Sequence, residues 1–142
     1  MAALKPSSAD APRSLSHILL VELDNRWCRE AGTLAPCEDA VPMGAVLARN
    51  AAGEYVPYMT KLSDAVAAAE GVEAKPAVYA DKAVAVSIST LLDPAEEAQP
   101  CVVVCRGVCV AAANLYFGAD VTDAQKQTAL GQLKTLGIIP KE

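Results

Sequence analysis

Three evenly spaced cysteines are the residues of this chain whose type and spacing most resemble a chemical site. Cys101, Cys105 and Cys109 form a Cys-x3-Cys-x3-Cys pattern. If residues 100–110 form one strand, the three thiols share a face, but residues four apart then lie roughly 13 Å apart. That separation is too long for two ligands of one tetrahedral zinc ion. The pattern therefore predicts small buried side chains, in a core or at a subunit contact.

Nucleophilic catalysis is equally poorly supported. A thiol nucleophile needs a base within hydrogen-bond reach, and the chain has one histidine, His17, which is distant in sequence from the cysteine run. The carboxylates fall at expected turns and helix starts, where solvation or capping explains them, and no glycine-rich phosphate loop is present. We therefore expect no catalytic residue, no metal and no cofactor. A thiol-dependent hydrolase is the enzymatic alternative.

Composition and charge narrow the remaining classes. Hydrophobic residues make up 53% of the 142 residues and charged residues 20%, which is typical of a folded domain. The formal net charge is −5, and no basic cluster is present, so neither nucleic-acid binding nor membrane attachment through basic residues is expected. The odd number of cysteines, five, argues against a fully paired disulfide framework. No stretch reaches the roughly 18 apolar residues of a membrane span, so we expect a soluble protein made in a reducing cytoplasm.

The first 27 residues differ in composition from the rest. Residues 1–14 are rich in Ala, Ser and Pro, which favours an extended segment. Residues 15–27 are predicted to form a short amphipathic strand, with a helix as the alternative. Their apolar side chains either pack on the body of the same chain or dock on a partner, and the tryptophan among them either anchors an interface or caps its own core. These apolar residues are Leu15, Ile18, Leu19, Leu20, Val21, Leu23 and Trp27.

Short apolar runs separated by Gly and Pro follow, which is typical of β structure. We expect strands at residues 33–35, 45–48, 55–58 and 83–88, with a turn at 50–54. Pro57 lacks an N–H, so its strand is predicted to be short or at an edge. Residues 100–110 have the strongest strand pattern, with Gly107 marking a bulge or a tight turn.

Two segments have helical character. Residues 61–75 favour a helix by propensity, with a loop as the alternative. Near the C-terminus, Thr122 and Gln125 have the spacing of a capping box, and Gly137 stands where a helix is expected to stop. The apolar stripe of this helix is Ala124, Ala129, Leu130, Leu133 and Leu136, and Ile138 and Ile139 are expected to fold back over it.

Taken in order, these motifs resemble the head decoration family of tailed bacteriophages, of the lambda type, over about residues 15–140. In that family a Gly-small-Val-Leu strand follows an N-terminal arm, and a short helix ending in Leu-x-Gly-Ile closes the domain. The cysteine-rich run departs from the family pattern. The matching pieces are Arg29–Leu34, Pro42–Leu47, Gly53–Tyr58, the run from Ala83 through 101–110, Asp123–Lys126 and Leu136–Ile139.

The resemblance implies an α+β, mainly β fold. It implies a small β-tulip or barrel-like decoration domain, residues 28–142, with a C-terminal helix, preceded by a capsid-binding arm, residues 1–27. It further implies a structural virion protein and not an enzyme. Such a protein forms homotrimers at threefold and quasi-threefold positions on the outer surface of a phage head, binds the major capsid protein there and stabilises the expanded, DNA-filled capsid.

The seven apolar residues from Leu15 to Trp27 are the expected capsid contacts. The alternative function is a small β-barrel carrier or adaptor module, which would need a modified lysine in an exposed hairpin. Lys61, Lys75 and Lys82 lack a convincing setting for that modification.

Overall fold

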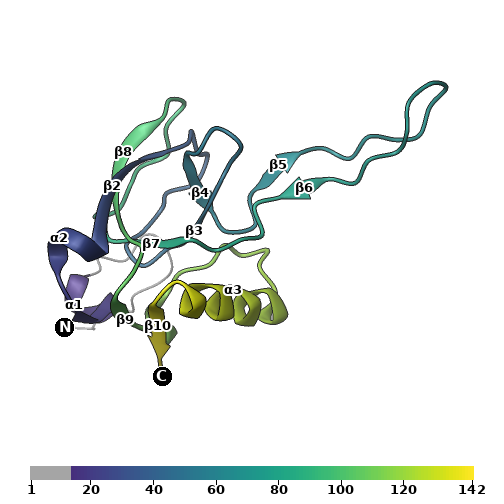
Figure 1. The fold of residues 1–142 in the computed structure, drawn as a ribbon. Helices are drawn as coiled ribbons and strands as arrows, with labels where there is room; N and C mark the ends of the chain where they lie inside the picture. The colour runs from purple at the N-terminus through teal and green to yellow at the C-terminus, as the bar shows by residue number, and fades with distance from the viewer. Residues whose placement is uncertain (1–13) are drawn as a thin grey trace, which may run out of the picture.

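The computed structural model describes residues 14–142 and is mainly β, with a C-terminal helix, as predicted. A closed barrel lies above a small sheet and a helix, and a long hairpin projects from the body (Figure 1). The elements in chain order are α1 (Leu15–Ile18), β1 (Leu19–Glu22), α2 (Asn25–Cys28), β2 (Arg29–Leu34), β3 (Val46–Arg49), β4 (Tyr55–Pro57), β5 (Lys61–Ser63), β6 (Val78–Tyr79), β7 (Ala85–Ser87), β8 (Gln99–Val104), β9 (Val108–Ala111), the 3₁₀ helix η2 (Ala112–Asn114), α3 (Asp123–Thr135) and β10 (Ile138–Lys141).

The barrel is closed in the strand order β2-β4-β3-β7-β8. Its longest pairing joins β2 to β8, antiparallel from Arg29 opposite Val104 to Leu34 opposite Gln99. Successive side chains of a strand point to opposite faces. Strands β3 and β8 therefore contribute to two hydrophobic cores. Leu47 and Val103 belong to one cluster, whereas their neighbours Val46 and Val104 belong to the other.

The second core lies between the barrel, α3 and a three-stranded sheet of order β1-β9-β10. Helix α3 begins at the predicted capping box, in which Thr122 and Gln125 bond reciprocally. Its buried stripe is narrower than expected, because only Ala129 and Leu133 are buried. Ile138 packs in the same core, but as the first residue of β10, which pairs in parallel with β9.

The helix predicted at residues 61–75 is wrong. This segment and the following residues form the β5–β6 hairpin, and residues 61–76 are all exposed. Helix propensity is a weak preference that tertiary context overrides. Here the ends of the segment are joined at the body, where the Met59 N–H donates to the Ala80 carbonyl at 2.7 Å and the Ala80 N–H to the Thr60 carbonyl at 2.8 Å.

The single strand expected at residues 100–110 is instead two strands. β8 belongs to the barrel and β9 to the small sheet, and the chain turns between them at Gly107, which has a φ of 67°. The tight turn anticipated at Gly107 is confirmed. The turn also separates the three cysteines, because Cys101 lies in β8, Cys105 in the turn and Cys109 in β9. They therefore do not share one strand face.

The segment at residues 15–28 folds as a short helix, a strand and a second short helix, so the strand prediction holds only for β1. β1 pairs antiparallel with β9, although the register shifts between Leu19 and Val21. Ile18 is fully buried, and Leu15 and Leu19 pack against the same core. Residues 1–13 of the predicted arm lie outside the described part of the chain.

Candidate functional site

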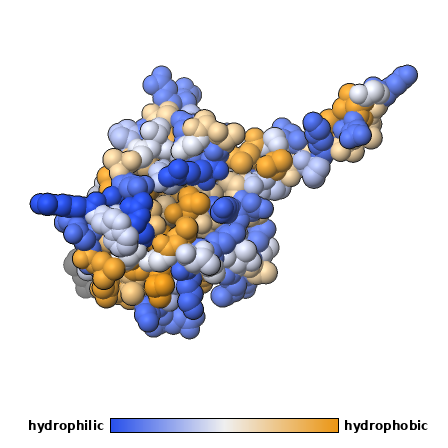
Figure 2. All heavy atoms as spheres, in the orientation of Figure 1, coloured by the Kyte–Doolittle hydropathy of each residue, from blue (hydrophilic) through white to orange (hydrophobic). Residues whose placement is uncertain are grey.

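Four of the seven expected contact residues present apolar surface to solvent. Leu20 is 50% exposed, Val21 52%, Leu23 72% and Trp27 53%. They lie on β1, on α2 and on the turn between them, and apolar atoms gather over the small sheet in Figure 2. We call these four residues the apolar patch. The other three, Leu15, Ile18 and Leu19, pack inward, so the structure separates exposed side chains from side chains that anchor the segment.

Helix α2 sets the position of Trp27. Asp24 caps it: the Asp24 carboxylate accepts from the Arg26 N–H at 2.8 Å, and the Asp24 carbonyl accepts from the N–H groups of Trp27 and Cys28. Asp is a favoured N-cap because its side chain satisfies a backbone donor left free at a helix start. Since Cys28 is fully buried beside Trp27, the backbone on both sides of the tryptophan is held in place.

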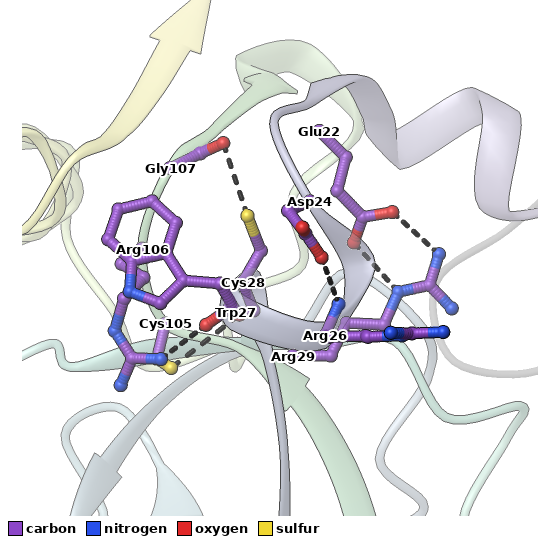
Figure 3. Close-up of polar contacts among 9 residues, drawn as sticks. All are labelled: Glu22, Asp24, Arg26, Trp27, Cys28, Arg29, Cys105, Arg106 and Gly107. Atoms are coloured by element: carbon purple, nitrogen blue, oxygen red, sulfur yellow. Dashed lines mark hydrogen bonds and ion pairs between the residues drawn. The ribbon is translucent and has the colours of Figure 1, made fainter.

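A bidentate ion pair ties the patch to the barrel. Arg29, the first residue of β2, donates from Nε and Nη2 to the two carboxylate oxygens of Glu22 at 2.7 and 2.8 Å (Figure 3). The hydrogen bonds to Glu22 raise the pKa of Arg29 above its ordinary value. Two parallel hydrogen bonds give such a pair defined geometry. Leu23 and α2 lie between these two residues in sequence and are therefore closed into a short, rigid loop.

The edge of β1 away from β9 pairs with no strand among residues 14–142. Unpaired backbone groups on an edge strand are a template for strand addition. This edge carries Leu20 and Val21 of the patch. The site therefore combines apolar side chains with an available strand edge.

The residues that might carry chemistry are not brought together. All five cysteines are free thiols, and within residues 14–142 no group of His, Cys, Asp and Glu has the arrangement of a metal site. Burial raises the pKa of the Cys101 thiol, and burial with the nearby Glu30 carboxylate raises that of Cys105. Both shifts disfavour the reactive thiolate.

The alternative of a carrier or adaptor module with a modified lysine in an exposed hairpin gains no support. Lys61 forms an exposed ion pair with Asp64 at 3.0 Å. The backbone of Lys75 forms an antiparallel β-bridge with Val66 in the hairpin. Neither stands at the Gly71 turn where the hairpin reverses. No helix in the described residues has the length and apolar character needed to cross a membrane.

Sequence reasoning missed the two residues that contact Trp27 from the β8–β9 turn. Arg106 and Gly107, in the β8–β9 turn, contact the indole and its backbone. The turn itself was signalled by Gly107. Its contact with Trp27, 80 residues earlier in the chain, leaves no local pattern.

A family model described as bacteriophage lambda head decoration protein D matches residues 9–138, from ahead of α1 into β10. No curated protein matches the chain. Since the family match spans nearly the whole chain, the protein belongs to the bacteriophage lambda head decoration protein D family.

Proposed function

We propose that this protein is a capsid cement. It binds the outer surface of a phage head at threefold and quasi-threefold positions and stabilises the expanded, DNA-filled capsid. The single observation that carries the proposal is membership in the head decoration family. The protein is synthesised in the host cytoplasm and then binds to the exterior of the virion. Contacts that form only on the expanded lattice stabilise that state by differential binding.

The apolar patch is the proposed contact with the major capsid protein. Leu20, Val21, Leu23 and Trp27 are each half-exposed or more, and burial of such side chains contributes on the order of 1 kcal/mol each. Leu15, Ile18 and Leu19 support the patch from the core side. The residues predicted as one capsid-binding set thus act in two roles, three as anchors and four as contacts.

Strand addition is the proposed backbone contribution. A segment of the major capsid protein completes the free edge of β1 through main-chain hydrogen bonds. A homotrimer presents three such surfaces. Weak individual contacts then multiply through effective concentration, which suits a protein whose single patch is small.

The test is reconstitution on heads that lack this protein. Leu23→Ser and Val21→Thr together remove apolar surface from the patch without altering a buried side chain. We expect the double variant to bind heads about tenfold more weakly or worse, and heads incubated with it to be less resistant to heat than heads decorated by the wild type. Bound protein is quantified after sedimentation of the heads.

A control of similar exposure is available on the hairpin. Val72 is 49% exposed, a fraction similar to the 52% of Val21, but it belongs to the β5–β6 hairpin, which projects away from β1 and α2 (Figure 1). Val72→Thr is expected to leave head binding unchanged. Full decoration by the patch variant would contradict the proposed surface, and absence of the wild-type protein from purified heads would contradict the proposed function.

A further inference from the structure

The β8–β9 turn forms a seat for the indole of Trp27. Gly107 lies against the ring: a Cβ placed on Gly107 would overlap Cζ3 of the indole and lie 3.0 Å from the sulfur of Cys28. Gly107 also has a φ of 67°, a conformation that strains residues with side chains. Two independent requirements therefore call for glycine at this position, and one of them is the place of the indole.

Arg106 holds the same tryptophan from the side (Figure 3). Its Nη1 donates to the Trp27 carbonyl, and its Nη2 donates to Glu30 Oε1 at 2.7 Å. The guanidinium carbon lies 5.9 Å from the centre of the indole ring, within range of a cation–π interaction. One side chain thus links the tryptophan ring, its backbone and the barrel strand β2.

The Gly107 carbonyl completes the seat. It accepts from the Leu23 N–H at 3.1 Å and from the Cys28 thiol at 3.4 Å. The turn therefore contacts Leu23 and Trp27, two of the four patch residues, and Cys28, the buried neighbour of Trp27. These bonds fix the patch relative to the turn even though the two segments are distant in sequence.

We propose that Arg106 and Gly107 are positioning residues that hold the Trp27 indole in one outward pose before the capsid is met. The inference rests on the proposed function, because it assigns to Trp27 the role of a rigid aromatic anchor in the capsid contact. Large aromatic side chains and arginines dominate binding energy at interfaces. Ordering a side chain in advance removes the entropy loss that binding would otherwise incur.

Trp27 is the only tryptophan in the chain, so its fluorescence reports the pose directly. In Gly107→Ala the added methyl group displaces the ring. We expect red-shifted emission, faster quenching by iodide and roughly three- to tenfold weaker binding to heads. Arg106→Leu is expected to act in the same direction without disturbing the glycine. Arg106→Lys keeps a cation near the ring and is expected to fall between Arg106→Leu and the wild type.

Two glycine controls separate the causes. Gly53 has a φ of 82°, but a Cβ placed on it would meet no atom within 4 Å. Gly53→Ala therefore introduces the same kind of backbone strain away from the indole. Gly118 has neither a positive φ nor a close neighbour, and Gly118→Ala tests the substitution alone. Both are expected to leave the emission and head binding as in the wild type. Thermal unfolding followed by circular dichroism establishes that each variant is folded.

The outcomes distinguish this inference from the proposed function. An indole that is freed in Gly107→Ala or Arg106→Leu while head binding is unchanged would overturn the positioning role. The same holds if Trp27→Ala binds normally but the Leu23 and Val21 variant does not, and in that case the proposed function stands. If the wild-type protein does not bind heads at all, the proposed function fails with it.

Discussion

The barrel and the β5–β6 hairpin are both mainly antiparallel β structure built mostly from small aliphatic residues, yet their surroundings are opposite. Only the β2–β4 pairing of the barrel is parallel. In the barrel, every residue of β7 and three of the four residues of β3 are buried. In the hairpin, every residue of β5 and β6 is exposed. The barrel strands pair on both sides and close on themselves, whereas the hairpin has only its own two strands.

Strand pairing alone therefore does not build a core. An isolated two-stranded hairpin is marginally stable in water, and this one is held at its base. There Ala80 is buried with Ala35, Ala48 and Val56. Met59, whose N–H bonds to the Ala80 carbonyl, adopts a φ of 68°. Closure and stacking on a second layer are what convert the same residue types into buried structure.

The largest expected effect compares one leucine from each region. Leu47 is fully buried in the barrel, whereas Leu62 of the hairpin is 39% exposed. Leu47→Ala is expected to lower the free energy of unfolding by about 2–5 kcal/mol because it leaves a cavity. Leu62→Ala is expected to change it by less than about 0.5 kcal/mol. Urea unfolding measures both, and equal losses would mean that the hairpin folds as part of the core.

A smaller effect, of opposite sign, concerns a buried hydroxyl. Ser87 in β7 is fully buried, and its Oγ has no hydrogen-bond partner among the described residues. Removing an unsatisfied buried polar group relieves its desolvation penalty, so Ser87→Ala is expected to stabilise the protein by roughly 1 kcal/mol. Ser63→Ala on the exposed hairpin is the matched control and is expected to have no measurable effect.

Ser89 provides the reverse control near the barrel. Its Oγ accepts from the Val102 N–H at 2.7 Å, so Ser89→Ala is expected to destabilise by about 1 kcal/mol. If Ser87→Ala is destabilising as well, Ser87 has a polar partner in solution and the barrel interior is less dry than its apolar lining indicates. Differential scanning calorimetry resolves these three variants.

The smallest effect is a pH dependence. The hydrogen bond from Arg106 holds the pKa of Glu30 below its ordinary value of 4.5, with Arg49 adding to the effect and burial opposing it. A lowered folded-state pKa stabilises the fold above pH 4.5, and this contribution is lost as the pH falls through the folded-state pKa. Because the Arg106 and Glu30 side chains are 32% and 41% exposed, we expect this ion pair to contribute only about a few tenths of a kcal/mol to stability.

Glu30→Gln is expected to remove this pH dependence from the free energy of unfolding. Urea unfolding at intervals of about one pH unit, between about pH 3 and pH 7, measures the change. The hairpin offers the comparison, because Lys61 and Asp64 form a solvent-exposed ion pair there. Asp64→Asn is expected to leave stability at neutral pH unchanged. A loss comparable to that of Glu30→Gln would show that the hairpin contributes to global stability.

Several elements were predictable because their determinants are local. Helix α3 starts where Thr122 and Gln125 can bond each other and ends before Gly137, which has a φ of 85°. The turn at 50–54 closes through the Asn50 side chain, whose oxygen accepts from the N–H groups of Ala52 and Glu54. These interactions join residues two to four positions apart, so the residue types at fixed spacing are sufficient.

The hairpin and the apolar patch were not predictable in the same way. Residues 61–75 have helical composition, and nothing local shows that Met59 and Ala80 meet. In the patch segment, Ile18 is fully buried and Leu20 is half-exposed, although both are aliphatic residues two positions apart. The sequence grouped seven apolar residues as one predicted contact set, and only the structure divides them into four exposed and three inward-packing side chains.

Residue types at short spacing were thus sufficient for the β-rich class, the C-terminal helix, the turn residues and the family. Tertiary structure alone decided that residues 99–111 split between two sheets, that residues 61–79 project as a hairpin and that Trp27 rests on Gly107. The physical reason is separation along the chain. Caps and turns are closed by near neighbours, whereas burial and strand partnership depend on residues such as Arg29 and Val104, which only the completed fold brings together.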